Sequence, residues 1–341
     1  MKYVWGFLAI LFVAAGAVTL RPDLLPGAEQ WVLRAPMAQI MALRPWLVLG
    51  FLGVALFLFV LAAIRRKLVD TGRIALVTAL AYLIMAVFHA AVIYMRGVES
   101  PAQLKPDHGV SEVGAGHGEI TVLSFNTLGA SVDMEEVANA VVRNGVDVLV
   151  LAETSAASGR ELTDLLARRD LTFHQFDTGT NPFEAEFKST VVLVSAALGE
   201  YIQVPAEGLP RSTVVVAPAN GQGPKIIGVH PIAPVFGAMQ QWKADISAIY
   251  SACSQGQPFI MAGDFNSTVD HQLALSAPCA DGRVEAGAGG LGTWPTRLPA
   301  LLGTPIDRVL HDGNTYRGVE AAEIPSGDSD HRGIVVRLAP R

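Results

Sequence analysis

Three long apolar runs in the first hundred residues constrain this chain more than any other feature of its sequence. Uncharged stretches cover residues 3–19, 46–64 and 74–95. A helix needs about 20 apolar residues to cross the hydrocarbon core of a bilayer, so we predict three transmembrane helices in a membrane domain of residues 1–96. The first run is also short enough to be a secretory signal peptide. We favour a retained helix, because no small-residue cleavage pattern follows it.

The basic residues between these runs predict an orientation, because Lys and Arg concentrate in the cytoplasmic loops of membrane proteins. The short connection between the second and third runs contains Arg65, Arg66, Lys67 and Arg73, whereas the longer first loop contains three arginines. We therefore predict a multi-pass protein of the cytoplasmic membrane whose N-terminus lies inside. Everything after Arg96 would then be extracytoplasmic.

The charge balance also divides the chain into two regions. Residues 1–100 hold nine Lys and Arg against four acidic residues, whereas residues 101–341 hold 16 against 27, a formal charge of −11. Residues 97–118 are rich in Gly, Pro and polar side chains and predict a linker. Beyond them, residues 119–341 alternate between near-continuous apolar runs, which predict buried strands, and helical patterns near 133–145, 160–168 and 236–253. Strands outnumber helices, which indicates an α/β domain with two packed sheets flanked by helices.

Two further features leave alternatives open. Cys253 and Cys279 both fall in the region predicted to be exported, where an oxidising compartment permits a disulfide; two buried free thiols are the alternative. His89 lies within the third apolar run. An ionisable group inside a membrane is a candidate for function, but we favour packing between helices or a place at the interface for this one.

Polar side chains follow several of the predicted strands at the point where each apolar run ends. They are Asn126, Glu153, His230, Asp264 and Asn266. A carboxylate at such a position costs free energy unless it is paired or bound to a metal. One polar strand end has little meaning, because strand ends meet water in any protein. Five in one chain predict that the side chains converge on a shared edge.

A second group of candidates lies near the C-terminus. Ser329, Asp330 and His331 follow a turn-forming IPSGD segment and precede the last predicted strand, and Asp307 begins another strand. A carboxylate next to an imidazole suits proton transfer and electrostatic stabilisation. For His331 taken alone, an ordinary surface histidine is the stronger interpretation.

The order and spacing of these motifs decide between the interpretations. An Asn, a Glu 27 residues later, a His, the GDFN sequence, Asp307 and the SDH triplet follow one another along the chain. This order resembles the endonuclease/exonuclease/phosphatase superfamily, which includes deoxyribonuclease-I-like nucleases, abasic-site endonucleases, inositol polyphosphate 5-phosphatases and neutral sphingomyelinases. The resemblance covers residues 119–338 and implies a four-layer α/β sandwich formed by two mixed sheets with helices on their outer faces.

The resemblance also implies roles for individual residues, in three groups. The implied metal ligands are Glu153, Asn126 and Asp330; the implied catalytic groups are Asp264, His331, His230 and Asp307; the implied phosphate contacts are Asn266 and Asn126. Hard oxygen ligands of this kind suit Mg²⁺ or Mn²⁺. Both ions would oppose the negative charge that develops during attack on a phosphoester.

Three positions depart from the pattern that the family shows. Ala152 stands where many members have Gln, Leu128 where many nucleases have an acid, and Arg308 where Tyr or His is common. None of these changes removes an implied catalytic group. Arg308 and Arg332 are candidates for contact with a substrate phosphate, and pairing with surface acids is the alternative for both.

The charge of the exported region bears on the substrate. Proteins that bind DNA without sequence preference depend on Lys and Arg to neutralise phosphates, and a domain with a charge of −11 and no long basic run is not suited to tight binding of this kind. A membrane anchor instead raises the effective concentration of lipid headgroups. Trp294, Leu298 and Leu301 precede Asp307 in a loop that could contact lipid, although core packing is favoured.

These observations lead to one leading hypothesis and two alternatives. The chain is predicted to be a membrane-anchored, divalent-metal-dependent phosphoesterase that hydrolyses a phosphodiester or phosphomonoester of a lipid or another cell-envelope substrate. An extracytoplasmic Mg²⁺-dependent nuclease is the enzymatic alternative. A non-catalytic binding or scaffold protein is the alternative of another class.

Overall fold

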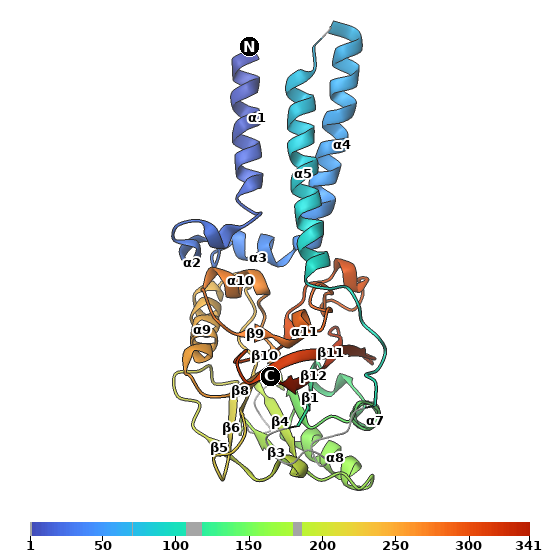
Figure 1. Cartoon of the computed structure of the whole chain (residues 1–341), viewed down its shortest axis with the longest axis vertical. Helices are drawn as coiled ribbons and strands as arrows, with labels where there is room; N and C mark the ends of the chain where they lie inside the picture. Colours follow the sequence, from blue (N-terminus) through green and yellow to red (C-terminus); the bar gives the residue numbers. More distant parts are fainter. Residues whose placement is uncertain (1, 70, 107–117, 180–185) are drawn as a thin grey trace.

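Three helices stand apart from the rest of the fold in the computed structural model of the chain, which describes residues 2–69, 71–106, 118–179 and 186–341. They are α1 (Lys2–Ala17), α4 (Arg44–Val69) and α5 (Arg73–Met95), and they extend from the same side of an α/β domain (Figure 1). Helices α4 and α5 are consecutive and pack against each other.

Helices α4 and α5 have the length and apolar character of membrane spans. Only 11% and 22% of the residues in their most apolar 18-residue windows are buried, whereas the core helix of a soluble protein would be mostly covered. The first predicted span, residues 3–19, forms a helix of 16 residues that ends at Ala17. Two of the three predicted segments are therefore long enough to cross a membrane, and the first is a shorter apolar helix.

Two mixed six-stranded sheets form the centre of the domain. In the first sheet, whose order is β11-β12-β1-β2-β4-β3, only β1 and β2 are parallel. Its strands are β1 (Ile120–Asn126), β2 (Val148–Ala152), β3 (Phe173–Asp177), β4 (Thr190–Ser195), β11 (Tyr316–Ile324) and β12 (Gly333–Pro340).

The second sheet has the order β5-β6-β7-β8-β10-β9, and its only parallel pair is β7 with β8. Its strands are β5 (Tyr201–Val204), β6 (Val214–Pro218), β7 (Lys225–Val229), β8 (Phe259–Asp264), β9 (Ala280–Asp281) and β10 (Asp307–His311). Each parallel pair thus lies inside its sheet, where both neighbours shield it from water.

The sheets pack face to face, and helices cover their outer faces. Val122 of β1 and Ile260 of β8 belong to one buried apolar cluster between the sheets, whereas Leu123 faces the other way. Strand side chains alternate between the two faces, and here both faces are buried. The helices α7 (Met134–Asn144), α8 (Ala156–Ala167) and α9 (Met239–Ser251) complete the layers. The predicted α/β fold with two mixed sheets flanked by helices is therefore confirmed.

The ends of the helices follow local chemistry. Asp133 caps α7 by accepting a hydrogen bond from the backbone N–H of Glu135, and Gly145 ends the helix in the left-handed conformation that glycine tolerates. The predicted helix at 236–253 instead begins at Met239. Residues 231–238 form a loop before it.

The segment between α1 and α4 belongs to the core of the α/β domain. It contains α2 (Ala28–Trp31) and α3 (Met37–Ala42), which lie between the long helices and the sheets (Figure 1). Val32, Leu33 and Met41 are fully buried and share an apolar cluster with Trp242 of α9. A boundary at residue 96 would therefore cut through this shared core.

The first part of the predicted linker also packs against the domain. Leu104 is buried, and its backbone N–H donates to the side chain of Asn144. Residues 107–117 of the predicted linker, 97–118, lie outside the described residues.

A buried ion network joins the long helices to the domain. Asp270 of α10 (Val269–Ala274) accepts hydrogen bonds from Arg44, the first residue of α4, at 2.5 Å, and from Arg96, just after α5, at 2.8 Å. Arg44 also contacts Nδ1 of His89 at 2.7 Å, and the Nε2 atom of this ring lies 3.1 Å from the hydroxyl of Thr19. His89 is thus packed between elements at the base of the helices.

The two arginines determine the charge state of Asp270. Burial of the carboxyl alone would raise its pKa, but the charges and hydrogen bonds of Arg96 and Arg44 outweigh burial and hold the pKa well below its ordinary value. The ion network is therefore fully charged at neutral pH. Removing one member of such a network leaves uncompensated charge in the interior.

We expect Asp270→Asn to destabilise the chain by about 3–5 kcal/mol at pH 7, because the buried Arg44 and the partly buried Arg96 lose their counter-ion. Since the folded pKa is depressed, the contribution of the carboxylate is complete above the ordinary carboxyl pKa of about 4 and is lost as the pH falls below it. The difference between parent and variant should therefore shrink in acid. Thermal unfolding of the detergent-solubilised chain, followed from pH 7 to pH 3, measures both effects.

Glu207→Gln is the matched control, because it also removes one carboxylate, from an exposed position. Equal melting temperatures for Asp270→Asn and Glu207→Gln would show that the network does not stabilise the fold.

Candidate active site

The polar strand ends of the two sheets meet at one edge, which we call the rim and define by Asn126, Glu153, His230, Asp264, Asp307 and His331. In the first sheet, the parallel register pairs Asn126 with Ala152, so that Glu153 follows directly on the neighbouring strand. In the second sheet, the antiparallel register pairs Asp264 with Asp307. The two sheets thus each bring two strand ends to the same place.

Asn126 connects the two sheets. Its Nδ2 atom donates to Oε1 of Glu153 at 2.9 Å and lies 3.2 Å from Oδ2 of Asp264. Its Oδ1 atom accepts a hydrogen bond from the backbone N–H of Leu128 at 3.0 Å, which fixes the amide so that its nitrogen faces the carboxylates. One buried amide therefore positions a carboxylate from each sheet.

The backbone at the rim adopts conformations that side chains normally avoid. Glu153 has a φ of 52° and Asn266 a φ of 45°, both in the left-handed region. Such residues cost about 1–3 kcal/mol each and persist only where the surrounding structure enforces them. At Gly263, with a φ of 143°, a Cβ atom would lie 1.9 Å from the carbonyl oxygen of Val229, so only glycine fits before Asp264.

His331 and Asp307 form a buried pair. The Nδ1 atom of His331 lies 2.8 Å from Oδ2 of Asp307, and its Nε2 atom lies 3.8 Å from Oδ2 of Asp264. Burial of the ring alone would lower its pKa, but the carboxylates of Asp307 and Asp264 outweigh burial and raise the pKa of His331 to about 10. The imidazole is therefore a cation at neutral pH, directed at the centre of the rim.

Asp264 is the most central carboxylate of the rim. It is 2% exposed, and burial, with a further contribution from the charge of Asp307, raises its pKa against the opposing effect of His331. The backbone N–H of Asn266 donates to its Oδ1 atom at 2.8 Å. A carboxylate with a raised pKa is suited to accepting a proton.

His230 and Asn266 flank the carboxylates. The Nε2 atom of His230 lies 3.6 Å from Oε1 of Glu153, and its buried Nδ1 atom has no hydrogen-bond partner among the described residues. The side-chain amide nitrogen of Asn266 donates to the carbonyl oxygen of Pro231, and the backbone carbonyl oxygen of Asn266 accepts from the indole of Trp242 at 2.9 Å. Both residues are thus fixed next to the rim, and the amide nitrogen of Asn266 is already engaged.

Asp330 is held at the border of the rim by Trp294, a residue for which the sequence predicted no role in the site. The indole of Trp294 donates to Oδ2 of Asp330 at 2.9 Å, and Oδ1 of Asp330 lies 3.9 Å from Nε2 of His331. A buried indole N–H normally finds an acceptor, which is the one signal that could have directed attention to this tryptophan. The loop that was considered for lipid contact therefore turns Trp294 inward, whereas Leu301 remains exposed.

The two arginines considered for phosphate binding are not brought to the rim. Arg308 follows Asp307 on β10 and so points to the opposite face of the sheet, where it bonds to Asp281, Tyr250 and Gln272. Arg332 donates to four backbone carbonyls, those of Gly292, Pro295, Thr296 and Leu298. These contacts occupy both guanidinium groups, which stabilise the scaffold around the rim.

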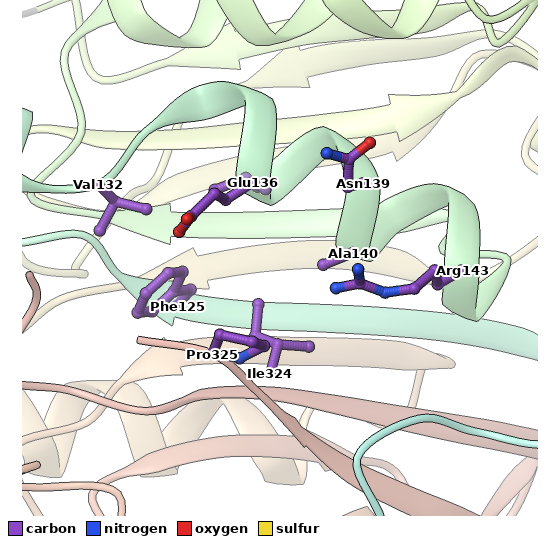
Figure 2. A pocket seen from close by; sticks show the side chains of 9 residues that line it. Phe125, Val132, Glu136, Asn139, Ala140, Arg143, Ile324 and Pro325 are labelled. Carbon is purple, nitrogen blue, oxygen red and sulfur yellow. The ribbon is translucent and has the colours of Figure 1, made fainter. Parts of the chain in front are cut away.

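A pocket of about 260 Å³ lies elsewhere on the domain. Figure 2 shows that it is lined by Phe125 of β1, residues of α7 such as Glu136 and Arg143, and Ile324 and Pro325. Phe125 and Asn126 are neighbours on a strand and point to opposite faces. The pocket is therefore separated from the rim by β1 itself.

The chemistry of the rim fits a divalent metal. The ligand atoms of Asp264, Asp307 and His331 lie within 4.8 Å of one another, but the Nδ1 atom of His331 is engaged with Asp307. At the rim and its border, one carboxylate oxygen of Asp307 and one of Asp330 are buried and have no hydrogen-bond partner among the described residues. Carboxylate oxygens that lack donors fit Mg²⁺ or Mn²⁺ better than softer ions.

The Cys253 and Cys279 side chains form a disulfide next to the second sheet, with a Cα–Cα distance of 5.3 Å. It joins the end of α9 to the segment before β9 and lies in the same apolar cluster as α2 and α3.

Comparison with known proteins places the chain in a family. The model of the endonuclease/exonuclease/phosphatase family matches residues 123–331. A comparison with curated proteins returns no significant match. A solved endonuclease/exonuclease/phosphatase structure from Beutenbergia cavernae DSM 12333 superposes with a TM-score of 0.50 at 18% identity, over 66% of this chain and 72% of that chain.

Two other solved structures score lower. The catalytic domain of human Nocturnin with bound sulfate gives a TM-score of 0.47 at 15% identity, over 66% of this chain and 94% of its own. D. rerio TDP2 in complex with a single-strand DNA product gives 0.49 at 16% identity, over 64% and 98%. The family match covers more than half of the chain and includes every residue of the rim, and the chain therefore belongs to the endonuclease/exonuclease/phosphatase family.

Proposed function

We propose that this chain is a membrane-anchored, divalent-metal-dependent phosphoesterase that acts outside the cytoplasmic membrane on a phosphoester of a lipid or of another cell-envelope molecule. The observation that carries the proposal is the arrangement of the buried Asn126, Asp264, Asp307 and His331 and the partly buried Glu153 at the meeting point of two sheets. A scaffold protein would have no need for a buried cation and carboxylates at this density.

The residues of the rim and the neighbouring Asp330 divide the chemistry among them. Glu153 and Asp330 would hold Mg²⁺ or Mn²⁺, which supplies positive charge against the negative charge that develops on phosphoryl oxygens. Asp264, with its raised pKa, accepts a proton from the attacking water. His331 presents its positive charge to the same phosphoryl group.

The remaining groups position these four. Asp307 keeps His331 protonated and oriented through the 2.8 Å contact with its Nδ1 atom. Asn126 holds Glu153 and Asp264 at a fixed separation through one amide nitrogen. The implied catalytic role of His230 and the implied phosphate contact of Asn266 remain part of the proposal, since both residues lie beside the carboxylates.

The apolar core that α2 and α3 share with α9 supports one topology of the chain in a membrane. Residues 28–42, before α4, pack into the same apolar cluster as α9, which follows α5. The two segments must therefore lie on the same side of a bilayer, which requires an even number of crossings between them. Helices α4 and α5 supply two, and the basic connection between them favours the cytoplasm for their far ends.

The disulfide supports the placement of the α/β domain outside the cytoplasm. Disulfides persist in oxidising environments outside the cytoplasm and are rare within it. A bridge between Cys253 and Cys279 within the α/β domain is consistent with the outward orientation that the arginine and lysine distribution predicts.

We expect the purified full-length chain to hydrolyse a phosphodiester only when Mg²⁺ or Mn²⁺ is present. The substrates to compare are bis(p-nitrophenyl) phosphate, vesicles made from a panel of phospholipids, and plasmid DNA. Loss of the cationic acid in His331→Ala should lower kcat/KM by a factor of about 10²–10⁴, whereas His174→Ala, at an exposed position of β3, should leave it unchanged.

Each outcome of this assay has a distinct meaning. DNA cleavage at physiological salt in preference to lipid would replace the proposed substrate with the nuclease alternative. The absence of turnover and of metal binding in the intact chain would favour a non-catalytic protein.

The Asp307–His331 pair predicts a change in pH dependence. With the pKa of His331 raised to about 10, the imidazole stays charged through neutral pH and loses its proton only as the pH rises through that value. Asp307→Asn removes the main attraction for the proton, so the pKa should fall and the alkaline limb of the kcat/KM profile should move to lower pH. An unchanged alkaline limb in this variant would show that His331 does not act as a cation held by Asp307.

The topology predicts the behaviour of reporter fusions. A reporter that is active only outside the cytoplasm should be active when fused after Arg341 and silent when fused after Lys67, in the connection between α4 and α5. A reporter that is active only in the cytoplasm should give the opposite pattern. Activity of the first reporter after Lys67 would refute the proposed orientation.

A further inference from the structure

The loop of residues 231–238, which connects β7 to α9, exposes a group of large apolar side chains. Val235 is 55% exposed and Phe236 completely exposed, and Ile232 is 43% exposed. The chain carries no charged residue between His230 and Lys243. Contiguous apolar side chains on the surface of a soluble domain usually mark a contact with a protein or a membrane.

This loop is fixed to the segment that leads into the long helices. The side-chain amide of Gln39 on α3 donates to the carbonyl oxygen of Pro234 at 2.7 Å, and Gln39 precedes the first residue of α4 by only five positions. The ammonium group of Lys243 on α9 donates to the carbonyl oxygen of Glu29 on α2. The helices α2 and α3 lie between the long helices and the sheets (Figure 1), so the loop belongs to the side of the domain from which those helices extend.

A second exposed apolar residue lies on the same side, by independent contacts. Leu301 is 54% exposed, and the carbonyl oxygen of its neighbour Leu302 accepts a hydrogen bond from the indole of Trp46, the third residue of α4. Two loops far apart in the sequence thus present apolar side chains beside the start of one apolar helix.

The same loop begins at the rim. His230 is its first neighbour, and the side-chain amide of Asn266 donates to the carbonyl oxygen of Pro231 at 3.0 Å. The loop of residues 231–238 is therefore connected directly to His230 and Asn266, which lie beside the carboxylates of the rim.

We propose that residues 231–238 dock in the interfacial layer of the bilayer that α4 and α5 cross, with Val235 and Phe236 at the boundary between headgroups and acyl chains. Apolar side chains at this depth bind a membrane by the area that they bury. This inference rests on the proposed membrane anchoring and extends it to the substrate: a phosphoester whose phosphate lies at headgroup level reaches the rim along the docked loop. Soluble phosphoesters would lack this route.

Fluorescence of an added tryptophan tests the docking without using activity. The full-length chain, as Phe236→Trp, is reconstituted in phosphatidylcholine nanodiscs with plain or brominated acyl chains, and the emission of the added tryptophan is taken as the difference from the parent chain. We expect this emission to be blue-shifted and to be lost in the brominated nanodiscs. Val235→Trp should behave in the same way, and it replaces Phe236→Trp if that variant does not fold.

Ile202→Trp is the matched control, because Ile202 is 50% exposed on β5, at the end of the domain away from the long helices (Figure 1). Its added emission should be insensitive to bromine and accessible to iodide. Added emission at 236 and 235 that resembles emission at 202 would overturn the proposal. Protection from iodide without quenching by bromine would also overturn it, in favour of contact with a second copy or another protein.

Hydrolysis measured on the same nanodiscs separates this inference from the proposed function. Quenching at position 236 in a chain that hydrolyses no phosphoester would preserve the docking loop and refute the phosphoesterase. Metal-dependent hydrolysis without quenching would preserve the phosphoesterase and refute the docking loop.

Discussion

The buried carboxylate of Asp270 holds the two parts of this chain together. It receives one arginine from the start of α4 and one from the end of α5, so the base of both long helices is bonded to a single side chain of the α/β domain. Buried and partly buried ionised groups such as these three are tolerated only when each is paired and hydrogen-bonded. The network therefore requires defined positions of all three side chains, and it fixes the distance between the helices and the sheets.

The ion network lies close to the candidate active site, because Asp270 follows Asp264 closely in the sequence. Asp270 follows Asp264 by six positions. The turn between them is held by His271, whose Nδ1 atom accepts from the backbone N–H of Thr268 while its Nε2 atom donates to the carbonyl oxygen of Ala38. Burial lowers the pKa of His271 to about 4, as this neutral pattern of hydrogen bonds requires. The turn that follows the central carboxylate is thus fixed on one side by the sheet and on the other by the segment leading into α4. Such fixed surroundings are what the left-handed backbone of Glu153 and Asn266 needs.

The sequence predicted the features that depend on local pattern and left open those that depend on partners distant along the chain. Apolar runs ending in polar residues predicted the strand ends of the rim, and the Asp133 and Gly145 caps are visible in the sequence. Arg308 could have been excluded, because it alternates with Asp307 along a strand. The packing of Val32 and Leu33 against α9, in contrast, was not predictable, since residues 20–43 are too short and irregular to show a period. The partners of Asp270 are 226 and 174 residues away, and no local sequence pattern predicts these ion pairs.

The charge of the α/β region restricts how it can meet a membrane. Anionic lipids attract clusters of Lys and Arg, whereas residues 101–341 carry a formal charge of −11, so any anionic lipid that faces this region would repel it. Electrostatics therefore cannot bring the rim to the headgroups. Covalent connection to α4 and α5, the Asp270 network and an uncharged apolar loop at 231–238 all act without attraction between charges. In the proposed arrangement, the domain would approach headgroups through its anchor, and a divalent cation at the rim would supply the positive charge that a substrate phosphate requires.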